Sequence, residues 1–157
     1  MMALQELHSL RISIRLRPRY AETDQMGVVY HANYLIWFHE ARDAMLAALG
    51  VDIRAIDESG FAFPVTESQC RHRAPARYGE EVWIAAAPVI EDGQAFSVAR
   101  LRVRYRVQSA KNMQILAEGE TVNVMTDRTG RLLLRLPECF EPMISRINAA
   151  RHRNFEA

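Results

Sequence analysis

Residues 34–49 are the segment that most constrains the fold of this chain. They contain no glycine or proline, and Gly50 follows them as a candidate C-capping residue. Apolar residues lie on nearly every side of a helix over this range, so the helix must be buried on several sides. At ~1.5 Å per residue it would span roughly 24 Å, a length that a curved sheet of ordinary strands can wrap. The sequence therefore predicts a buried central helix covered by a sheet.

Alternation of apolar and polar residues marks the strands of that sheet. Residues 10–17 alternate with a period of two and end at Pro18, which is typical of a half-buried strand. After a polar connection at residues 51–60, turn signals separate a series of longer strands. These strands are expected at residues 61–72, 80–90, 94–107 and 114–125. One strand, one helix and then four antiparallel strands predict an α+β fold.

The last part of the chain is expected to form a short helix over residues 138–150, with residues 151–157 frayed. A chain of 157 residues with 49% hydrophobic content is long enough to bury one core and too short for two. We therefore expect a single domain over residues 1–157.

Charge and hydrophobicity argue against several classes of protein. The formal net charge is +1 with 25% charged residues, which gives no support for a nucleic-acid partner. No apolar run approaches the roughly 20 residues of an integral membrane segment, and the N-terminus lacks a signal-peptide pattern, so we expect a cytoplasmic protein. Cys70 and Cys139 lie far apart in the sequence and are expected to be reduced structural thiols.

The usual motifs for metals and cofactors are missing from the sequence. Its five histidines have no zinc-binding spacing, and its two cysteines are not paired. The sequence has no P-loop, no dinucleotide-binding fingerprint and no Gly-x-Ser-x-Gly nucleophile elbow. We therefore expect a protein that uses neither a metal nor a cofactor.

The segment just before the central helix carries candidate catalytic groups. Asp24 lies on a loop with Gly27 three residues later, and Asn33 is placed to cap the helix with its side chain. Backbone amides and the positive end of the macrodipole at a helix N-terminus favour developing negative charge. A carboxylate and these amides could act together on one substrate carbonyl, so we interpret the segment as an active site.

Four segments of the chain together resemble a known family. They are Tyr20–Tyr34, Tyr34–Arg42, Phe61–Val65 and Ala74–Glu80. Residues 12–125 thereby resemble the 4-hydroxybenzoyl-CoA thioesterase-like family of the hotdog superfamily, most closely the branch typified by the Tol–Pal-associated acyl-CoA thioesterase. The resemblance implies a hotdog fold, in which an antiparallel sheet of about five strands wraps around a long central helix. It also implies a homodimer or homotetramer with active sites at the seam between protomers.

The resemblance gives roles to three residues of the loop. Asp24 takes the position of the catalytic carboxylate, either as a general base toward water or as a nucleophile that forms a mixed anhydride. The backbone amide of His31 would donate a hydrogen bond to the thioester oxygen, a contact whose loss typically costs ~10²–10³ in rate. Tyr20 and the His31 side chain complete a Tyr, Asp and His set, either as catalytic groups or as packing and hydrogen-bonded support.

Four further residues are candidate substrate contacts. Gly27 would let a substrate approach the backbone, although glycine also supplies a positive φ in a turn. Tyr30 would shape the pocket or fill core space, and Asn33 lies where the helix begins. Arg77 lies on the turn after the 61–72 strand and would contact the phosphates of coenzyme A, with Arg128 as a rival.

Four arginines recur at every second position of one expected strand, which sets them on a single face. They are Arg100, Arg102, Arg104 and Arg106. One interpretation is a solvated outer face on which Glu118 and Glu120 of the next strand relieve the repulsion. The alternative is that one or two of the arginines bind coenzyme A phosphates or acids across a subunit interface.

The sequence and the resemblance together predict an acyl-CoA thioesterase that releases a carboxylic acid and free CoA. A hotdog hydratase or dehydratase acting on acyl thioesters is the alternative enzyme. A non-catalytic module that binds acyl thioesters is the alternative from another class, because a fold and its pocket can outlast the chemistry. The acyl group and the choice between CoA and acyl carrier protein stay open.

Overall fold

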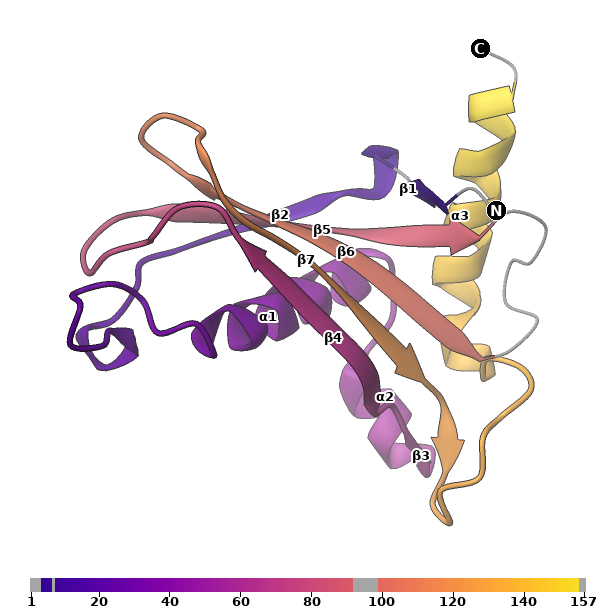
Figure 1. Cartoon of the computed structure of the whole chain (residues 1–157). Coiled ribbons are helices and arrows are strands. Elements are labelled where there is room, and N and C mark those ends of the chain that lie inside the picture. Colours follow the sequence, from indigo (N-terminus) through magenta and orange to yellow (C-terminus); the bar gives the residue numbers. More distant parts are fainter. Residues whose placement is uncertain (1–3, 7, 92–98, 156–157) are drawn as a thin grey trace.

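Helix α1 lies against one face of a curved antiparallel sheet (Figure 1). The computed structural model describes residues 4–6, 8–91 and 99–155. The helices are α1 (Asn33–Ala48), α2 (Ile53–Glu58) and α3 (Glu141–Phe155), with short 3₁₀ helices η1 (His8–Leu10), η2 (Tyr20–Glu22) and η3 (Glu138–Phe140). The strands are β1 (Leu4–Glu6), β2 (Ile12–Leu16), β3 (Phe61–Ala62), β4 (Val65–His72), β5 (Val82–Glu91), β6 (Arg100–Ser109), β7 (Ile115–Val124) and β8 (Thr126–Asp127).

The main sheet has six strands in the order β1–β5–β6–β7–β4, and β2 pairs with β5 along the same edge as β1. Every pairing is antiparallel. The expected α+β hotdog arrangement of a sheet around α1 is confirmed, and β1 is a strand that the sequence did not predict. The short strands β3 and β8 form a separate two-stranded sheet.

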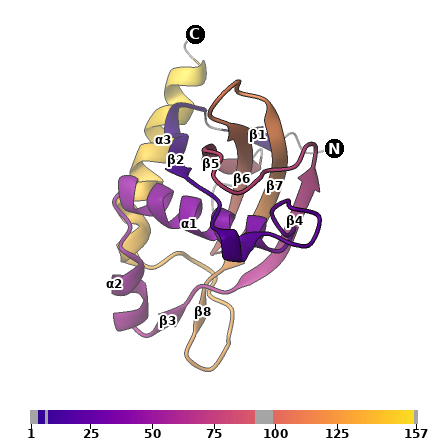
Figure 2. The ribbon, with the colours of Figure 1, turned by 90° about the vertical axis from the view of Figure 1, so that its left-hand side faces the viewer.

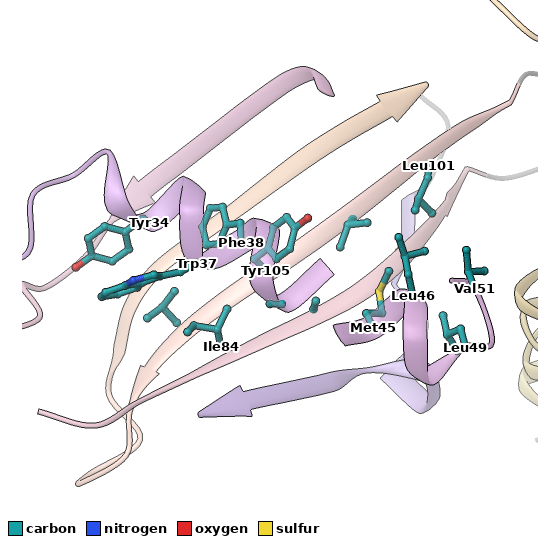
Figure 3. Close-up of a cluster of buried hydrophobic side chains, with 14 of the residues drawn as sticks. Tyr34, Trp37, Phe38, Met45, Leu46, Leu49, Val51, Ile84, Leu101 and Tyr105 are labelled. Atoms are coloured by element: carbon teal, nitrogen blue, oxygen red, sulfur yellow. The ribbon is translucent and has the colours of Figure 1, made fainter. Parts of the chain in front are cut away.

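The core lies between α1 and the inner face of the sheet (Figure 3). Trp37, Phe38, Met45 and Leu46 of α1 are each no more than 2% exposed. The ring of Phe38 stacks on the ring of Tyr105 from β6, with centroids 4.4 Å apart and planes 7° from parallel. Burying side chains of this size contributes roughly 1.5–3 kcal/mol each, so this face of α1 supplies much of the stability.

Gly119 of β7 leaves the space that Phe38 occupies. A Cβ at this position would overlap the Phe38 ring and lie 2.6 Å from the carbonyl oxygen of Gln69. A glycine within a strand often marks a place where another group approaches the backbone closely. The distance between α1 and the sheet therefore depends on the missing side chain at Gly119.

Gly50 ends α1, as the sequence predicts. It has a φ of +87°, and the amide of Val51 donates to the carbonyl of Leu46 at 2.9 Å, the outer bond of a Schellman motif. Arg146 of α3 donates a hydrogen bond to the Ala48 carbonyl. Figure 2 shows α3 beside this end of α1. The guanidinium thus lies at the negative end of the helix dipole, where a cation is favoured.

Two segments differ from the sequence prediction. Residues 61–72, expected as one strand, form β3 and β4 instead, because Pro64 has no amide to donate and β3 diverges to pair with β8. The connection at residues 51–60 contains α2, whose N-cap Asp52 accepts a hydrogen bond from the Arg54 amide at 2.9 Å. Aspartate at an N-cap is the local signal that could have predicted this helix.

The C-terminal helix is longer than expected. Helix α3 continues to Phe155, past the expected end at Ala150, because residues 151–155 contain no glycine or proline to stop it. Residues 94–98 of the expected fourth strand, and residues 156–157, lie outside the described residues. Over the ranges that the structure describes, no helix is both long and apolar enough to span a bilayer.

We expect Gly119→Ala to lower the free energy of unfolding by about 3 kcal/mol, the upper end of the usual cost of overpacking, because a ring and a strand backbone must both move. Urea unfolding followed by circular dichroism measures this change. Gly130→Ala is the control, since its added methyl group meets no atom within 4 Å and only the φ of +84° is strained. That control should cost about 1 kcal/mol. A Gly119→Ala protein as stable as the wild type would show that α1 does not depend on this close approach.

Candidate active site

Asp24 lies on a closed loop between η2 and α1. Its amide donates to the Val28 carbonyl at 2.9 Å, and the amide of Gly27 donates back to the Asp24 carbonyl at 2.9 Å. Its carboxylate oxygen Oδ1 accepts a hydrogen bond from the Met26 amide at 2.8 Å. The other carboxylate oxygen has no hydrogen-bond partner in the described part of the chain. The turn therefore fixes Asp24 while leaving one of its oxygens available.

The turn that leads into α1 leaves two backbone amides available. The amide of Asn33 donates to the Tyr30 carbonyl at 2.9 Å, and the amide of Tyr34 donates to the His31 carbonyl at 3.3 Å. Among the described residues, the amides of His31 and Ala32 donate to no protein group. They lie at the positive end of the α1 dipole, where an anionic oxygen is favoured.

Asn33 does not cap α1, which corrects the sequence prediction. The N-cap position is Ala32, which has helical backbone angles, and no side chain caps the helix there. The side-chain amide of Asn33 donates instead to the carbonyl of Glu22 at 2.9 Å. The turn carbonyls already take the amides that a cap would serve, so Asn33 joins the helix start to the chain that enters the loop.

Glu22 joins both ends of the loop from a buried position. Its carbonyl accepts hydrogen bonds from the Tyr30 amide at 2.8 Å and from the Asn33 side chain. Its carboxylate accepts hydrogen bonds from the Arg19 amide at 2.6 Å and from the Trp37 indole at 3.1 Å. Burial raises the pKa of Glu22, but the hydrogen bonds from Arg19 and Trp37 outweigh it and leave the pKa below its ordinary value. Glu22 is therefore a carboxylate at neutral pH.

Asp24 and His31 line the same pocket, which has a volume of about 330 Å³. Tyr34 from α1, His72 at the end of β4 and residues 73–75 after it also line this pocket. A carboxylate oxygen without a partner can orient or deprotonate a water molecule. Unpaired amides can stabilise an oxygen that becomes negative in the transition state. The pocket therefore combines the groups required for acyl transfer to water.

Tyr34 fixes the wall opposite the loop. Its hydroxyl accepts a hydrogen bond from the Ala76 amide at 3.3 Å, and the Ala76 carbonyl accepts one from the Val29 amide at 2.8 Å. The edge of one ring meets the face of the other between Tyr34 and His72, with centroids 4.7 Å apart. Burial raises the pKa of Tyr34, so its hydroxyl stays neutral. The Ala76 backbone thus joins α1 to the loop that carries Asp24.

The structure does not bring Tyr20 to this pocket. Tyr20 is 77% exposed, and its ring packs edge-on against Tyr78 at 5.8 Å. No hydrogen bond joins its hydroxyl to Asp24 or His31 in the described residues. Tyr30 is also exposed, with its ring 4.3 Å from the His31 ring. Of the expected Tyr, Asp and His set, the described structure therefore places only Asp24 and His31 in the pocket.

Gly27 and Arg77 lie side by side at the tip of the loop. A guanidinium nitrogen of Arg77 donates to the Gly27 carbonyl at 3.4 Å, and the Arg77 amide donates to Glu80 at 3.0 Å. Gly27 has a φ of +71°, and a Cβ there would come no closer than 3.9 Å to Arg77. The turn conformation, not a lack of space, therefore requires this glycine. The Arg77 guanidinium has no carboxylate partner among the described residues.

Sequence reasoning missed the structural roles of Glu22, Trp37 and His72. Glu22 stands two residues before Asp24, but one sequence does not show that a glutamate is buried. Trp37 is core, as expected, and its indole also donates to Glu22. The alternation along β4 places His72 on the same face as Cys70, toward α1. This alternation could have predicted that His72 lies near α1.

The arginine series lies on the outer face of β6 and is paired with acids. Ion pairs join Arg100 to Glu67 at 2.7 Å, Arg102 and Arg104 to Glu120, and Arg106 to Glu118 at 3.6 Å. Both kinds of charge line a polar cavity of about 570 Å³ on β4, β6 and β7. These pairs favour the interpretation that neighbouring acids relieve the arginine repulsion. Arg73 joins this face to the Asp24 pocket, because it lines both cavities and pairs with Glu118 at 3.3 Å.

Comparisons with known proteins point to one family. Residues 18–145 match the family described as the thioesterase-like superfamily. A 1,4-dihydroxy-2-naphthoyl-CoA hydrolase from Synechococcus elongatus is 30% identical over 122 residues, which cover 76% of this chain and 85% of that protein. A protein from Bacillus subtilis, provisionally named an acyl-CoA thioesterase, is 45% identical over 62 residues, 40% of this chain and 45% of that protein.

The fold is also similar to solved structures. The structure of a 1,4-dihydroxy-2-naphthoyl-CoA thioesterase from Synechocystis has a TM-score of 0.76 and 25% sequence identity to this chain. The match covers 88% of this chain and 98% of that one. The sheet around α1 is therefore shared with a thioesterase over almost the whole length of the solved protein.

We expect both cysteines to be inert toward thiol reagents in the folded protein. Burial raises the pKa of Cys70 to about 11 and also raises the pKa of Cys139, so little thiolate is present near neutral pH. At pH 8, reaction of Cys70 with Ellman's reagent should be about 10²-fold slower than reaction of an exposed thiol. The Cys139→Ser protein isolates Cys70, and the same protein unfolded in guanidinium gives the reference rate. Rapid labelling of folded Cys70 at pH 8 would contradict the buried, protonated thiol.

Proposed function

The chain belongs to the thioesterase-like superfamily, and on that premise we propose that it hydrolyses an acyl-CoA thioester to a carboxylic acid and free CoA. The enzyme class, thioester hydrolase, follows from the family and from its named relatives. One observation supports the placement of the chemistry: Asp24 and His31 line the same pocket, and among the described residues one carboxylate oxygen of Asp24 and the backbone amide of His31 have no hydrogen-bond partner.

In this mechanism the acyl carbonyl lies between Asp24 and the start of α1. The amide of His31, with Ala32 beside it, donates to the carbonyl oxygen as it becomes negative, and the α1 dipole adds to the stabilisation. The available oxygen of Asp24 either takes a proton from the attacking water or attacks the carbonyl itself. In the first route the water oxygen bonds to the acyl carbon, the carbon–sulfur bond breaks, and the proton held by Asp24 passes to the departing thiolate. In the second route Asp24 displaces the thiolate, which takes a proton from solvent, and a water molecule then cleaves the mixed anhydride to release the acid and restore Asp24.

The substrate contacts follow from the same geometry. Tyr34 and His72 line the wall that faces the acyl carbonyl, and Arg77 lies at the loop tip, where no carboxylate of the described residues pairs with its guanidinium. Arg77 is therefore the favoured contact for the anionic part of coenzyme A. Because named relatives act on 1,4-dihydroxy-2-naphthoyl-CoA, that thioester is the first to test.

A second copy of the chain fits the open edge of the sheet at β4. Among the described strands β4 pairs with β7 alone, and β4 is exposed along most of its length. An unpaired edge offers a row of backbone groups to another strand. Antiparallel pairing centred on Gln69 would set Glu67 opposite Arg71 of the second copy, on the same face, twice. Such a homodimer would place the seam next to His72 and the pocket.

Several sequence-based expectations stay predictions. They are the relation to the Tol–Pal-associated branch, a single domain over residues 1–157, a cytoplasmic location, and assembly of dimers into a tetramer. Acyl carrier protein also stays an alternative to CoA as the thiol carrier. A comparison of hydrolysis rates for the same acyl group on the two carriers decides between them.

We expect Asp24→Asn to lower kcat/KM by ~10²–10⁴-fold, because the amide keeps the shape of the side chain but cannot act as a base or nucleophile. Thiol release is measured with dihydroxynaphthoyl, hydroxybenzoyl, short aliphatic and long fatty acyl-CoAs. Asp57→Asn on α2, which removes the same charge at an exposed position, should keep the wild-type rate. Unchanged hydrolysis by the Asp24→Asn protein across the panel would refute the mechanism.

We expect Arg71→Glu to weaken a homodimer by about tenfold or more, because two attractive pairs become two repulsive ones, each worth roughly 0.2–1 kcal/mol. The double variant Glu67→Arg with Arg71→Glu should restore much of the affinity. Sedimentation equilibrium measures the dissociation constant. Arg54→Glu on α2 changes the net charge equally and should have no effect. A dimer insensitive to all three changes would rule out this register.

A further inference from the structure

We infer that Glu22 is a positioning residue that sets the placement of Asp24 relative to the free amides of His31 and Ala32. Glu22 does not line the pocket, and its effect on the reaction would pass through the loop. Its kinetic consequence rests on the proposed function, whereas its structural consequence can be measured without any substrate.

The Glu22 carbonyl binds the residues on either side of His31 and Ala32. It accepts hydrogen bonds from the amide of Tyr30, just before His31, and from the side chain of Asn33, just after Ala32. The two residues whose amides are available are thus bracketed by two bonds to one oxygen atom. Movement of Glu22 would move the amides as a unit.

The Glu22 carboxylate ties the same residue to the core. Trp37, which is 2% exposed on α1, donates its indole N–H to Glu22 at 3.1 Å. Because Asp24 follows only two residues later, the rigid helix is connected to the catalytic carboxylate through a short piece of chain. Side chains that are locked by such supporting bonds keep a site within the small tolerance that catalysis requires.

The donors around Glu22 require a carboxylate. The Arg19 amide at 2.6 Å, the Arg19 guanidinium at 3.4 Å and the Trp37 indole all point hydrogens at its two oxygens. A glutamine would place its own N–H groups against one of these donors, because a carboxylate accepts at both oxygens and an amide at one. Glu22→Gln therefore keeps the shape and disturbs the hydrogen bonding.

The first test is Glu22→Gln measured with the best substrate of the acyl-CoA panel. We expect kcat to fall by ~10–10²-fold with KM changed less than about threefold, because misplacement by about 1 Å affects the reaction more than binding. The control is Glu58→Gln on α2, an exposed glutamate far along the chain, which should leave both constants unchanged. Trp37→Phe removes one donor and keeps the carboxylate, so it should lower kcat by a smaller factor.

The second test needs no substrate. In ¹H–¹⁵N spectra, Glu22→Gln should shift the amide resonances of His31 and Ala32 and leave those of β5 and β6 in place. Wild-type kcat together with unshifted His31 and Ala32 amides would overturn the inference. A wild-type protein that hydrolyses no thioester would instead refute the proposed function, and the amide shifts would still decide the role of Glu22. If Glu22→Gln does not fold, kcat and KM of Trp37→Phe decide, and unchanged values overturn the inference.

The pH dependence of stability gives a third readout. Because the pKa of Glu22 in the folded protein lies below its ordinary value of 4.5, the ionised side chain adds stability above pH 4.5, and this is lost as the pH falls below it. The difference in melting temperature between wild type and Glu22→Gln should therefore shrink on going from pH 7 to pH 3. A difference that does not change with pH would contradict an ionised, hydrogen-bonded Glu22.

Discussion

The contact between Phe38 and Gly119 sets the depth at which α1 lies in the sheet. The Phe38 ring occupies the space that a side chain at position 119 of β7 would fill, and it stacks on Tyr105 of the neighbouring strand β6. Close-packed interiors tolerate little change in volume, so α1 can move neither closer to the sheet nor farther from it without disturbing this contact. The side chains of the first two turns of α1 that contact the Asp24 loop are therefore held at the same depth.

The loop that carries Asp24 depends on α1 at two points. Trp37, the neighbour of Phe38 in the sequence, donates its indole N–H to Glu22, which lies just before the loop in the sequence. The hydroxyl of Tyr34, one turn earlier, accepts a hydrogen bond from the Ala76 amide, and the Ala76 carbonyl accepts one from the amide of Val29, which follows Asp24 in the loop. The loop is thus supported by core residues rather than by its own contacts alone. This arrangement explains how an exposed loop can hold a carboxylate and an amide in a fixed relation.

Local patterns in the sequence predicted the parts of the structure that depend on near neighbours. The apolar segment at residues 34–49 and Gly50 predicted α1 and its end, and alternation predicted most strands. Helix α2 and the full length of α3 were missed although local signals were present, whereas two other failures involve partners far apart in the sequence. β3 leaves the line of β4 to pair with β8, and Asn33 gives up its cap for the carbonyl of Glu22. No local pattern can contain such a partner, because the competing contact exists only in the folded chain.

The candidate site shows the same division between local and distant information. The loop acid and the amide-rich helix start were predictable, because both follow from residues within about one turn of each other. The sequence did not predict which amides stay free, because that depends on how the preceding turn is closed. The Tyr30 carbonyl accepts from the Asn33 amide, and the Glu22 carbonyl accepts from the Tyr30 amide. The amides of His31 and Ala32 are left without a partner among the described residues. Both residues are exposed, and His31 lines the pocket, so water can satisfy these amides until a substrate oxygen replaces it. Two unpaired amides are therefore inexpensive to keep here, although the same pair would be costly inside the core.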